Sequence, residues 1–170
     1  MKAIKFFAVA ILFSGVSVIS SAQVTATATA SSTIVTPIGI TKTVDMNFGN
    51  VAINSTTAGT VVLAPAGTRT STGGVTLPAT AGTVTAAEFT VSGVNNYTFS
   101  ITLPSTSHEI KSGSNTMSVT GFTSTPTPTG TLSATGSATV KVGATLNVSA
   151  GQAAGTYTSV TPFEVTVNYN

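Results

Sequence analysis

The sequence is poor in several residue types, and each shortage excludes a class of protein. It contains no cysteine, no tryptophan and a single histidine, and only 6% of its residues are charged. Without cysteine there is no disulfide framework, no thiolate nucleophile and no cysteine-ligated zinc site. Helix-forming Leu, Glu, Lys and Gln are scarce, while Thr, Val, Ala, Ser and Gly are abundant. This composition favours strands joined by turns over helices.

The first 22 residues have the pattern of an export signal. Two lysines near the start precede the apolar run Phe6–Phe13, and Ser20 and Ala22 are small residues placed for cleavage. The run is too short and wrongly flanked to cross a membrane as a helix. We interpret residues 1–22 as a signal peptide and residues 23–170 as one domain, with no membrane span left after the signal is removed. The expected location is the cell surface or the extracellular medium, reached through the inner membrane and, in transit, the periplasm.

The charge balance changes when this leader is set aside. The whole chain carries six basic and four acidic residues, but two of the lysines belong to residues 1–22. The remaining charges are four of each sign: Lys42, Arg69, Lys111 and Lys141 against Asp45, Glu88, Glu109 and Glu164. A domain without net charge gives no reason to expect nucleic acid or an anionic membrane as a partner. The same neutrality favours self-association.

The C-terminal segment alternates strictly between apolar and polar residues. Phe163, Val165, Val167 and Tyr169 fall on one side of an extended chain, and the residues between them are polar. Such alternation, rich in β-branched and aromatic residues, predicts a strand over 161–170 with one buried face. A strand in this position has no later segment to pair with. We therefore expect it to pair with an earlier strand, or with another molecule, and to close the fold.

Further short strands are expected along the rest of the domain. Their alternating or β-branched residues are bounded by Gly, Pro and Asn turn signals. The expected ranges are 23–30, 34–44, 60–63, 75–77, 84–91, 97–103, 117–122 and 137–148, the last kinked at Gly143. About eight to ten short strands, without helices for parallel crossovers, predict an all-β fold that is either an antiparallel β-sandwich or a small barrel.

No group of residues predicts catalysis or metal binding. His108 stands beside Glu109 in a polar stretch between turn signals, and the second histidine of a zinc helix motif is absent because position 112 is serine. We expect His108 to be an exposed loop residue. The four carboxylates are far apart in sequence, and neither a calcium loop nor a glycine-rich phosphate loop is present. We therefore expect a non-enzymatic protein with no catalytic residues, no bound metal and no cofactor.

Four stretches resemble one family of bacterial secreted domains of unknown function. They are Met46–Val51 (MNFGNV), Gly59–Leu77, Glu88–Pro104 and Val140–Asn170, which span most of the predicted domain. That family is similar to spore coat protein U and to pilin-like adhesin subunits. The resemblance implies an immunoglobulin-like sandwich and a place in surface filaments. Pilins commonly carry a disulfide and complete their sandwich with a neighbour's N-terminal strand, whereas this chain has no cysteine, so whether its sandwich is complete by itself is open at this stage.

Both ends of the predicted domain suit β-strand addition, in which an extended segment of one molecule pairs with a sheet edge of another. They could equally be ordinary edge strands of a self-contained sandwich. The candidate residues for strand exchange or assembly are Val24, Ala26, Ala28, Ile34, Ile38, Ile40, Phe163, Val165, Val167 and Tyr169.

The predicted function is a structural subunit of a surface fibre, pilus or coat. Its expected partners are copies of itself or related subunits, together with a periplasmic chaperone or outer-membrane assembly machinery. The alternative is a self-contained secreted or surface binding module, adhesin-like and able to bind glycans. Tyr97, Phe122 and Tyr157 are the candidate aromatic residues for such a site.

Overall fold

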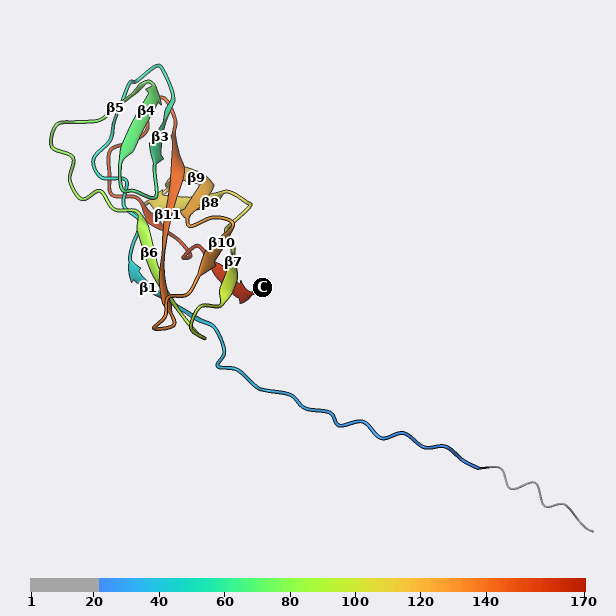
Figure 1. Cartoon of the computed structure of the whole chain (residues 1–170). Coiled ribbons are helices and arrows are strands. Elements are labelled where there is room, and N and C mark those ends of the chain that lie inside the picture. The colour runs from blue at the N-terminus through green and yellow to red at the C-terminus, as the bar shows by residue number, and fades with distance from the viewer. Residues whose placement is uncertain (1–21) are drawn as a thin grey trace, which may run out of the picture. The chain divides into compact units, whose positions relative to one another are not determined.

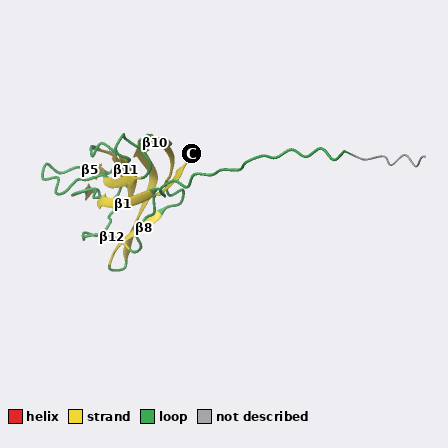
Figure 2. Cartoon of the chain, turned by 60° about the horizontal axis from the view of Figure 1, so that its bottom comes forward, coloured by secondary structure: helices red, strands yellow, loops and turns green. Residues whose placement is uncertain are grey.

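The structure is a computed structural model that describes residues 22–170. The predicted signal peptide therefore lies outside the described residues, apart from Ala22. Residues 22–170 contain thirteen strands and no helix (Figure 2). The strands are β1 (Gly39–Val44), β2 (Ala52–Ile53), β3 (Gly59–Leu63), β4 (Arg69–Gly73), β5 (Val75–Thr76), β6 (Ala87–Ser92), β7 (Thr98–Thr102), β8 (His108–Ser112), β9 (Asn115–Thr125), β10 (Thr129–Thr131), β11 (Ser137–Val148), β12 (Thr158–Ser159) and β13 (Thr166–Tyr169). None of the described residues lies in a helix of the length and apolarity that crossing a membrane requires.

Residues 34–170 form one compact unit, and residues 22–33 lie outside it. Residues 22–33 contain no strand, and every one of them is exposed. The strand predicted at 23–30 is therefore absent. Its apolar positions are one valine and three alanines, which offer too little surface to offset the entropy of ordering the backbone.

The strands of the compact unit form three antiparallel sheets. The largest has the order β1-β6-β11-β9-β8-β12, with β3 pairing with both β11 and β4. A smaller sheet has the order β10-β7-β13, and β2 pairs with β5. In Figure 1, β1, β6 and β11 run side by side, and β3 and β4 continue the large sheet at the opposite end from the C-terminus. The predicted antiparallel β-sandwich is confirmed, while the immunoglobulin-like arrangement stays a prediction.

The long strand β11 holds the large sheet together. Its first half pairs with β6 over Ser137–Val142, and its second half pairs with β3 over Ala144–Val148. Gly143 lies where the partner changes, and a side chain there would collide with the backbone of Leu63. Glycine is required because the backbone at the end of β3, from Leu63 to Pro65, lies where a β-carbon would be. The predicted kink at Gly143 is thus a change of partner within one strand.

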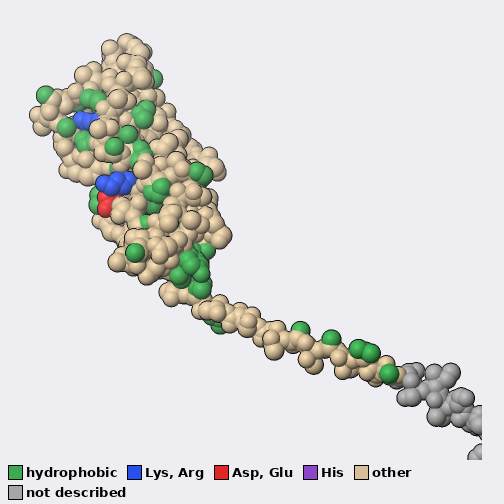
Figure 3. Space-filling model, in the orientation of Figure 1, with side chains coloured by type: hydrophobic (Ala, Val, Ile, Leu, Met, Phe, Trp, Pro, Cys, Tyr) green, Lys and Arg blue, Asp and Glu red, His purple; other side chains and the backbone are tan. Residues whose placement is uncertain are grey.

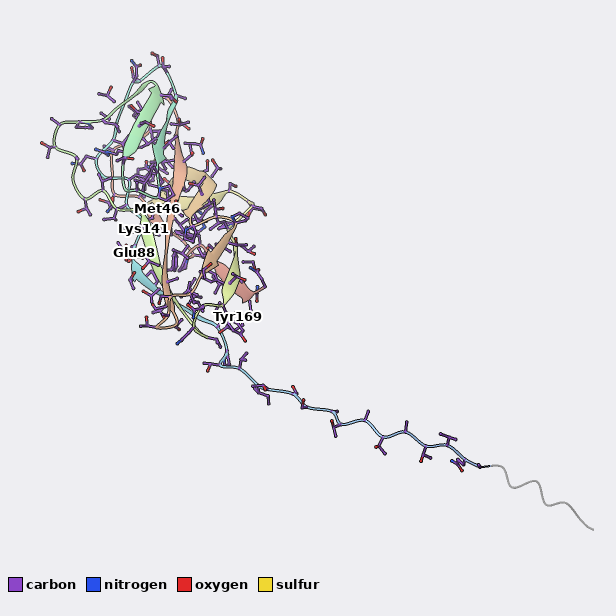
Figure 4. The ribbon with its side chains drawn as sticks, in the orientation of Figure 1. Met46, Glu88, Lys141 and Tyr169 are labelled. Atoms are coloured by element: carbon purple, nitrogen blue, oxygen red, sulfur yellow. The ribbon has the colours of Figure 1, made fainter. Side chains whose placement is uncertain are left out.

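Two clusters of buried apolar side chains form the core. The first contains residues of β6, β7, β11 and β13, so it lies between the large sheet and the three-stranded sheet: Ala87, Phe89, Val91, Phe99, Leu132, Val140, Val142 and Val167. The second lies at the β3–β5 end: Val61, Val75, Val119, Ala144, Leu146 and Val148. Met46 and Phe122 pack against both clusters. Figure 4 shows Met46 in the middle of the compact unit and Tyr169 near one end.

Charged side chains are sparse on the surface of this unit. On the face shown in Figure 3, few charged groups are visible, and the acidic one lies against a basic one. Lys141 Nζ lies 3.4 Å from a Glu88 carboxylate oxygen, across neighbouring strands β11 and β6 (Figure 4). The Lys141 side chain is exposed and that of Glu88 is partly exposed, so this pair contributes less than about 1 kcal/mol to stability.

Candidate functional site

The ten residues predicted to take part in assembly fall into three different environments. Val24, Ala26 and Ala28 lie in the exposed segment 22–33, where Val24 is 93% exposed. Ile34 is 97% exposed and precedes the first strand. These four residues make no buried contact of their own, which leaves them available for a surface outside the compact unit.

Ile38 and Ile40 are placed differently from the residues before them. Both are partly buried and pack against the first core cluster, Ile40 from within β1 and Ile38 from the residue before it. They are therefore part of the sandwich. The prediction grouped them with the N-terminal exchange residues, and the structure separates them from that group because the fold begins at Ile38.

The C-terminal residues form the strand that the alternation predicts, but it is shorter. Only Thr166–Tyr169 form β13, which pairs with β7, an earlier strand. Val167 is buried and Tyr169 half-buried, while Asn168 is exposed, so the predicted buried face is confirmed. Phe163 and Val165 pack against the core without belonging to a strand.

Phe163 is partly buried and packs among other aromatic rings at the first core cluster. Its ring lies 5.1 Å from the ring of Phe122, 6.4 Å from Phe89 and 5.9 Å from His108, measured between ring centroids. The segment before β13 is thus held by aromatic packing rather than by ladder hydrogen bonds. That packing explains why the strand predicted from Thr161 begins only at Thr166.

The edges of the two main sheets meet beside β13. β1 is the end strand of the large sheet, β13 is an end strand of the three-stranded sheet, and the two strands contact each other. Partly buried apolar side chains from both flank this seam: Ile38 and Ile40 from the β1 side, and Val165 and Tyr169 from the β13 side. We call this region the β1–β13 seam. Val167 of β13 is 7% exposed, whereas six of the other seven members of the first cluster are at most 1% exposed.

Tyr169 forms hydrogen bonds at one end of the seam. Its hydroxyl donates a hydrogen bond to the carbonyl oxygen of Thr36 at 3.0 Å and accepts one from the backbone N–H of Val94 at 2.7 Å. Its ring also packs edge-on against Tyr97, with centroids 5.6 Å apart. The sequence pattern predicts the inward face of Tyr169 but not these partners, because contacts across 75 and 133 residues leave no local pattern.

A known protein family matches most of the compact unit. Residues 38–169 match the family described as "Domain of unknown function (DUF4402)". The chain belongs to this family. Neither a curated protein nor a solved structure matches the chain.

The DUF4402 match begins at Ile38, the first residue packed against the core, and ends at Tyr169, the last residue of β13. The seam is therefore part of the DUF4402 domain on both of its sides. The exposed segment 22–33 precedes it.

His108 of the DUF4402 domain is not the exposed loop residue that the sequence predicted. It is the first residue of β8 and is half-buried against Phe163. Its Nε2 lies 3.0 Å from Ser159 Oγ, which joins β8 to the short strand β12. The loop prediction was wrong because the flanking turn signals bound a strand of alternating polar and apolar residues, in which only Ile110 is strongly apolar.

The carboxylates of the DUF4402 domain are not clustered. Three of the four form an ion pair, each with a different lysine. Asp45 pairs with Lys42 at 2.7 Å, Glu109 with Lys111 at 2.8 Å, and Glu88 with Lys141. Within residues 22–170, no three His, Asp or Glu side chains come together in a way that could hold a metal ion.

The three candidate aromatic residues for glycan binding are dispersed over the DUF4402 domain. Phe122 lies between the two core clusters, and Tyr97 packs against Tyr169. Tyr157 donates its hydroxyl hydrogen to the carbonyl oxygen of Ala153 and accepts a hydrogen bond from Gln152. They form no common aromatic platform.

Proposed function

We propose that the protein is an exported, non-enzymatic structural subunit of a surface fibre, pilus or coat that assembles by β-strand addition. The observation that carries this proposal is the exposed, strandless segment 22–33 in front of a sandwich that has unpaired strand edges. A sheet edge presents backbone groups to which an extended segment can add. Its partners in the assembly are other copies of this chain, and export machinery delivers it to the surface.

The sequence supports the same function in two further ways. The balanced and sparse charge of residues 23–170 gives little repulsion between copies. The resemblance to spore coat protein U and to pilin-like adhesin subunits fits a subunit that assembles in many copies. An immunoglobulin-like arrangement of the sandwich belongs to the same proposal.

The test compares two chains on an unboiled denaturing gel. One is the full chain, and the other lacks residues 23–33 but keeps Thr36, so that the hydrogen bond to Tyr169 is preserved. We expect the full chain, sheared from the cell surface, to give a ladder that collapses to one band on boiling. The deleted chain is expected to give the monomer band alone, with an unchanged free energy of unfolding. A monomer band from both chains contradicts the proposal.

A self-contained binding module is the second candidate, and one surface feature favours it. A hollow of about 580 Å³ lies over β3, β8, β9 and β11, and hydrogen-bonding side chains line much of it, including Thr60, Glu109, Ser118 and Asn147. Hydroxyl, amide and carboxylate groups together are the chemistry that sugars require. Saturable binding to one glycan, abolished by Glu109→Gln and Thr60→Val, would favour this candidate over the fibre subunit.

A further inference from the structure

The outer edge of β13 offers backbone groups that the sandwich does not use. The backbone N–H of Asn170 donates to the carbonyl oxygen of Thr98, and Asn168 is paired with Ser100 in the same register. In an antiparallel ladder, alternate residues direct both of their backbone groups to the same side. Residues 166, 168 and 170 therefore face β7, and Val167 and Tyr169 direct their N–H and C=O groups away from it. Among residues 22–170, no other strand pairs with β13.

This edge lies along the β1–β13 seam, and the burial of the side chains at the seam limits which segment can bind there. The added strand would lie beside Val167, which is already 93% buried. The seam is therefore shallow, and large inward side chains have no cavity to enter. A segment held there needs small apolar side chains on its inner face and backbone groups for the ladder.

Residues 24–34 have these properties. Val24, Ala26, Ala28, Ala30 and Ile34 share one face of an extended chain, with Ser32 between the last two. Threonine and serine occupy the other face from Thr25 to Thr33. The small alanines, which cannot form a strand of their own, suit a shallow seam, and the larger Val24 and Ile34 would lie at its two ends.

We propose that the outer edge of β13 is the acceptor site, and that it pairs with residues 24–34 of a second copy of the chain. This inference rests on the proposed function and names the surface that the assembly uses. The alanine face of the donor lies against the seam, and its threonine face continues the outer surface of the three-stranded sheet beside Asn168. Affinity comes from backbone hydrogen bonds to Val167 and Tyr169.

Cysteine pairing tests this site, because the native chain has no cysteine to interfere. Asn168 faces outward on β13, and toward a donor strand it occupies a non-hydrogen-bonded position, where opposite side chains are closest. Thr129 is the control at the opposite edge of the same sheet, where it also faces outward beside Ser100 and is exposed. Its backbone groups point away from β7, so it occupies a hydrogen-bonded position toward any strand added at β10, and its yield reports background cross-linking.

Each experiment mixes two proteins, both expressed as the full chain and purified. One is tagged and carries Thr25→Cys, Thr27→Cys or Thr29→Cys, which scans the register of the donor. The other is untagged and carries Asn168→Cys or Thr129→Cys. After mild oxidation, a non-reducing gel shows the tagged–untagged heterodimer at its own size. Because each chain has one cysteine, this band reports pairing between copies only.

We expect at least one threonine position to yield heterodimer with Asn168→Cys at tenfold or more above its yield with Thr129→Cys. Ala28→Cys, on the inward face of the donor, is expected to yield no more than the Thr129→Cys control. Equal yields at the two edges, or from both faces of the donor, overturn the acceptor site.

A parallel measurement separates this inference from the proposed function. The cysteine-free chain is examined for the boil-sensitive ladder under the same conditions. A ladder without heterodimer at Asn168→Cys refutes the β13 site and leaves the fibre subunit standing. The absence of any ladder refutes both.

Discussion

The hydroxyl of Tyr169 donates a hydrogen bond of 3.0 Å to the carbonyl oxygen of Thr36, across 133 residues of sequence. The same oxygen accepts the N–H of Val94 at 2.7 Å. One phenol thus joins the entry to β1, the exit from β6 and the last strand. Any donor segment that starts before Thr36 leaves from this fixed point.

Replacing Tyr169 by phenylalanine keeps the ring and removes both hydrogen bonds. We expect Tyr169→Phe to lower the free energy of unfolding by about 1–3 kcal/mol, because the partly buried Val94 N–H loses its acceptor. Urea denaturation followed by circular dichroism measures the change. Tyr97→Phe is the control, since Tyr97 is 44% exposed, and its expected change is below about 0.5 kcal/mol. Equal effects at the two positions would show that the Tyr169 hydroxyl adds nothing.

Arg69 holds two loops together through backbone carbonyl groups. Its Nη1 donates to the carbonyl oxygens of Phe48 at 2.5 Å and Asn50 at 2.7 Å, and its Nη2 approaches that of Ala81 at 3.5 Å. We expect Arg69→Lys to cost about 1.5–3 kcal/mol, because a single ammonium group cannot reproduce the planar fork.

The control for Arg69→Lys is Lys141→Met, which removes a positive charge from an exposed pair. Its expected effect on the free energy of unfolding is below about 1 kcal/mol. If both variants unfold at the same urea concentration, the loop contacts of Arg69 are not stabilising.

Gly130 lies directly against the ring of Phe99, which is completely buried. A methyl group at position 130 would overlap that ring, so Gly130→Ala is expected to destabilise the protein by about 1–3 kcal/mol. Gly39→Ala is the matched control, because its new methyl group would meet only the Ser92 hydroxyl at 3.2 Å. Thermal unfolding of the two variants compares them, and a larger loss at Gly39 would contradict the packing described.

Met46, like Phe122, packs against both core clusters and so links the two ends of the sandwich. Met46→Leu conserves volume and is expected to cost less than about 1.5 kcal/mol. Met46→Ala leaves a gap and is expected to cost about 2–4 kcal/mol. If urea denaturation shows a similar loss in the free energy of unfolding for both variants, the volume of the Met46 side chain does not contribute to packing.

The sequence predicts the fold class and the inward face of β13 because period-2 alternation directly reports which residues share a face. It overestimates two segments for opposite reasons. Residues 23–30 alternate but carry too little apolar surface to form a strand alone. Phe163 also alternates correctly, yet three neighbouring aromatic rings hold it outside the ladder.

The candidate acceptor site could be predicted only in part. Val167 and Tyr169 were identified from their pattern, whereas the direction of their backbone groups depends on the pairing of β13 with β7. The contacts of Arg69 and the position of His108 depend equally on tertiary packing. No local rule relates an arginine to carbonyl groups 12 to 21 residues away in two separate loops.

The central position of β11 has a consequence for how the chain is made. β11 pairs with β3, β6 and β9, all of which precede it, and it ends at Val148 of a 170-residue chain. The large sheet therefore cannot close until most of the polypeptide has been synthesised. Pairings between distant segments fold slowly, and apolar strands that wait for a partner aggregate readily. The strands made before β11 therefore wait without their shared partner until late in synthesis.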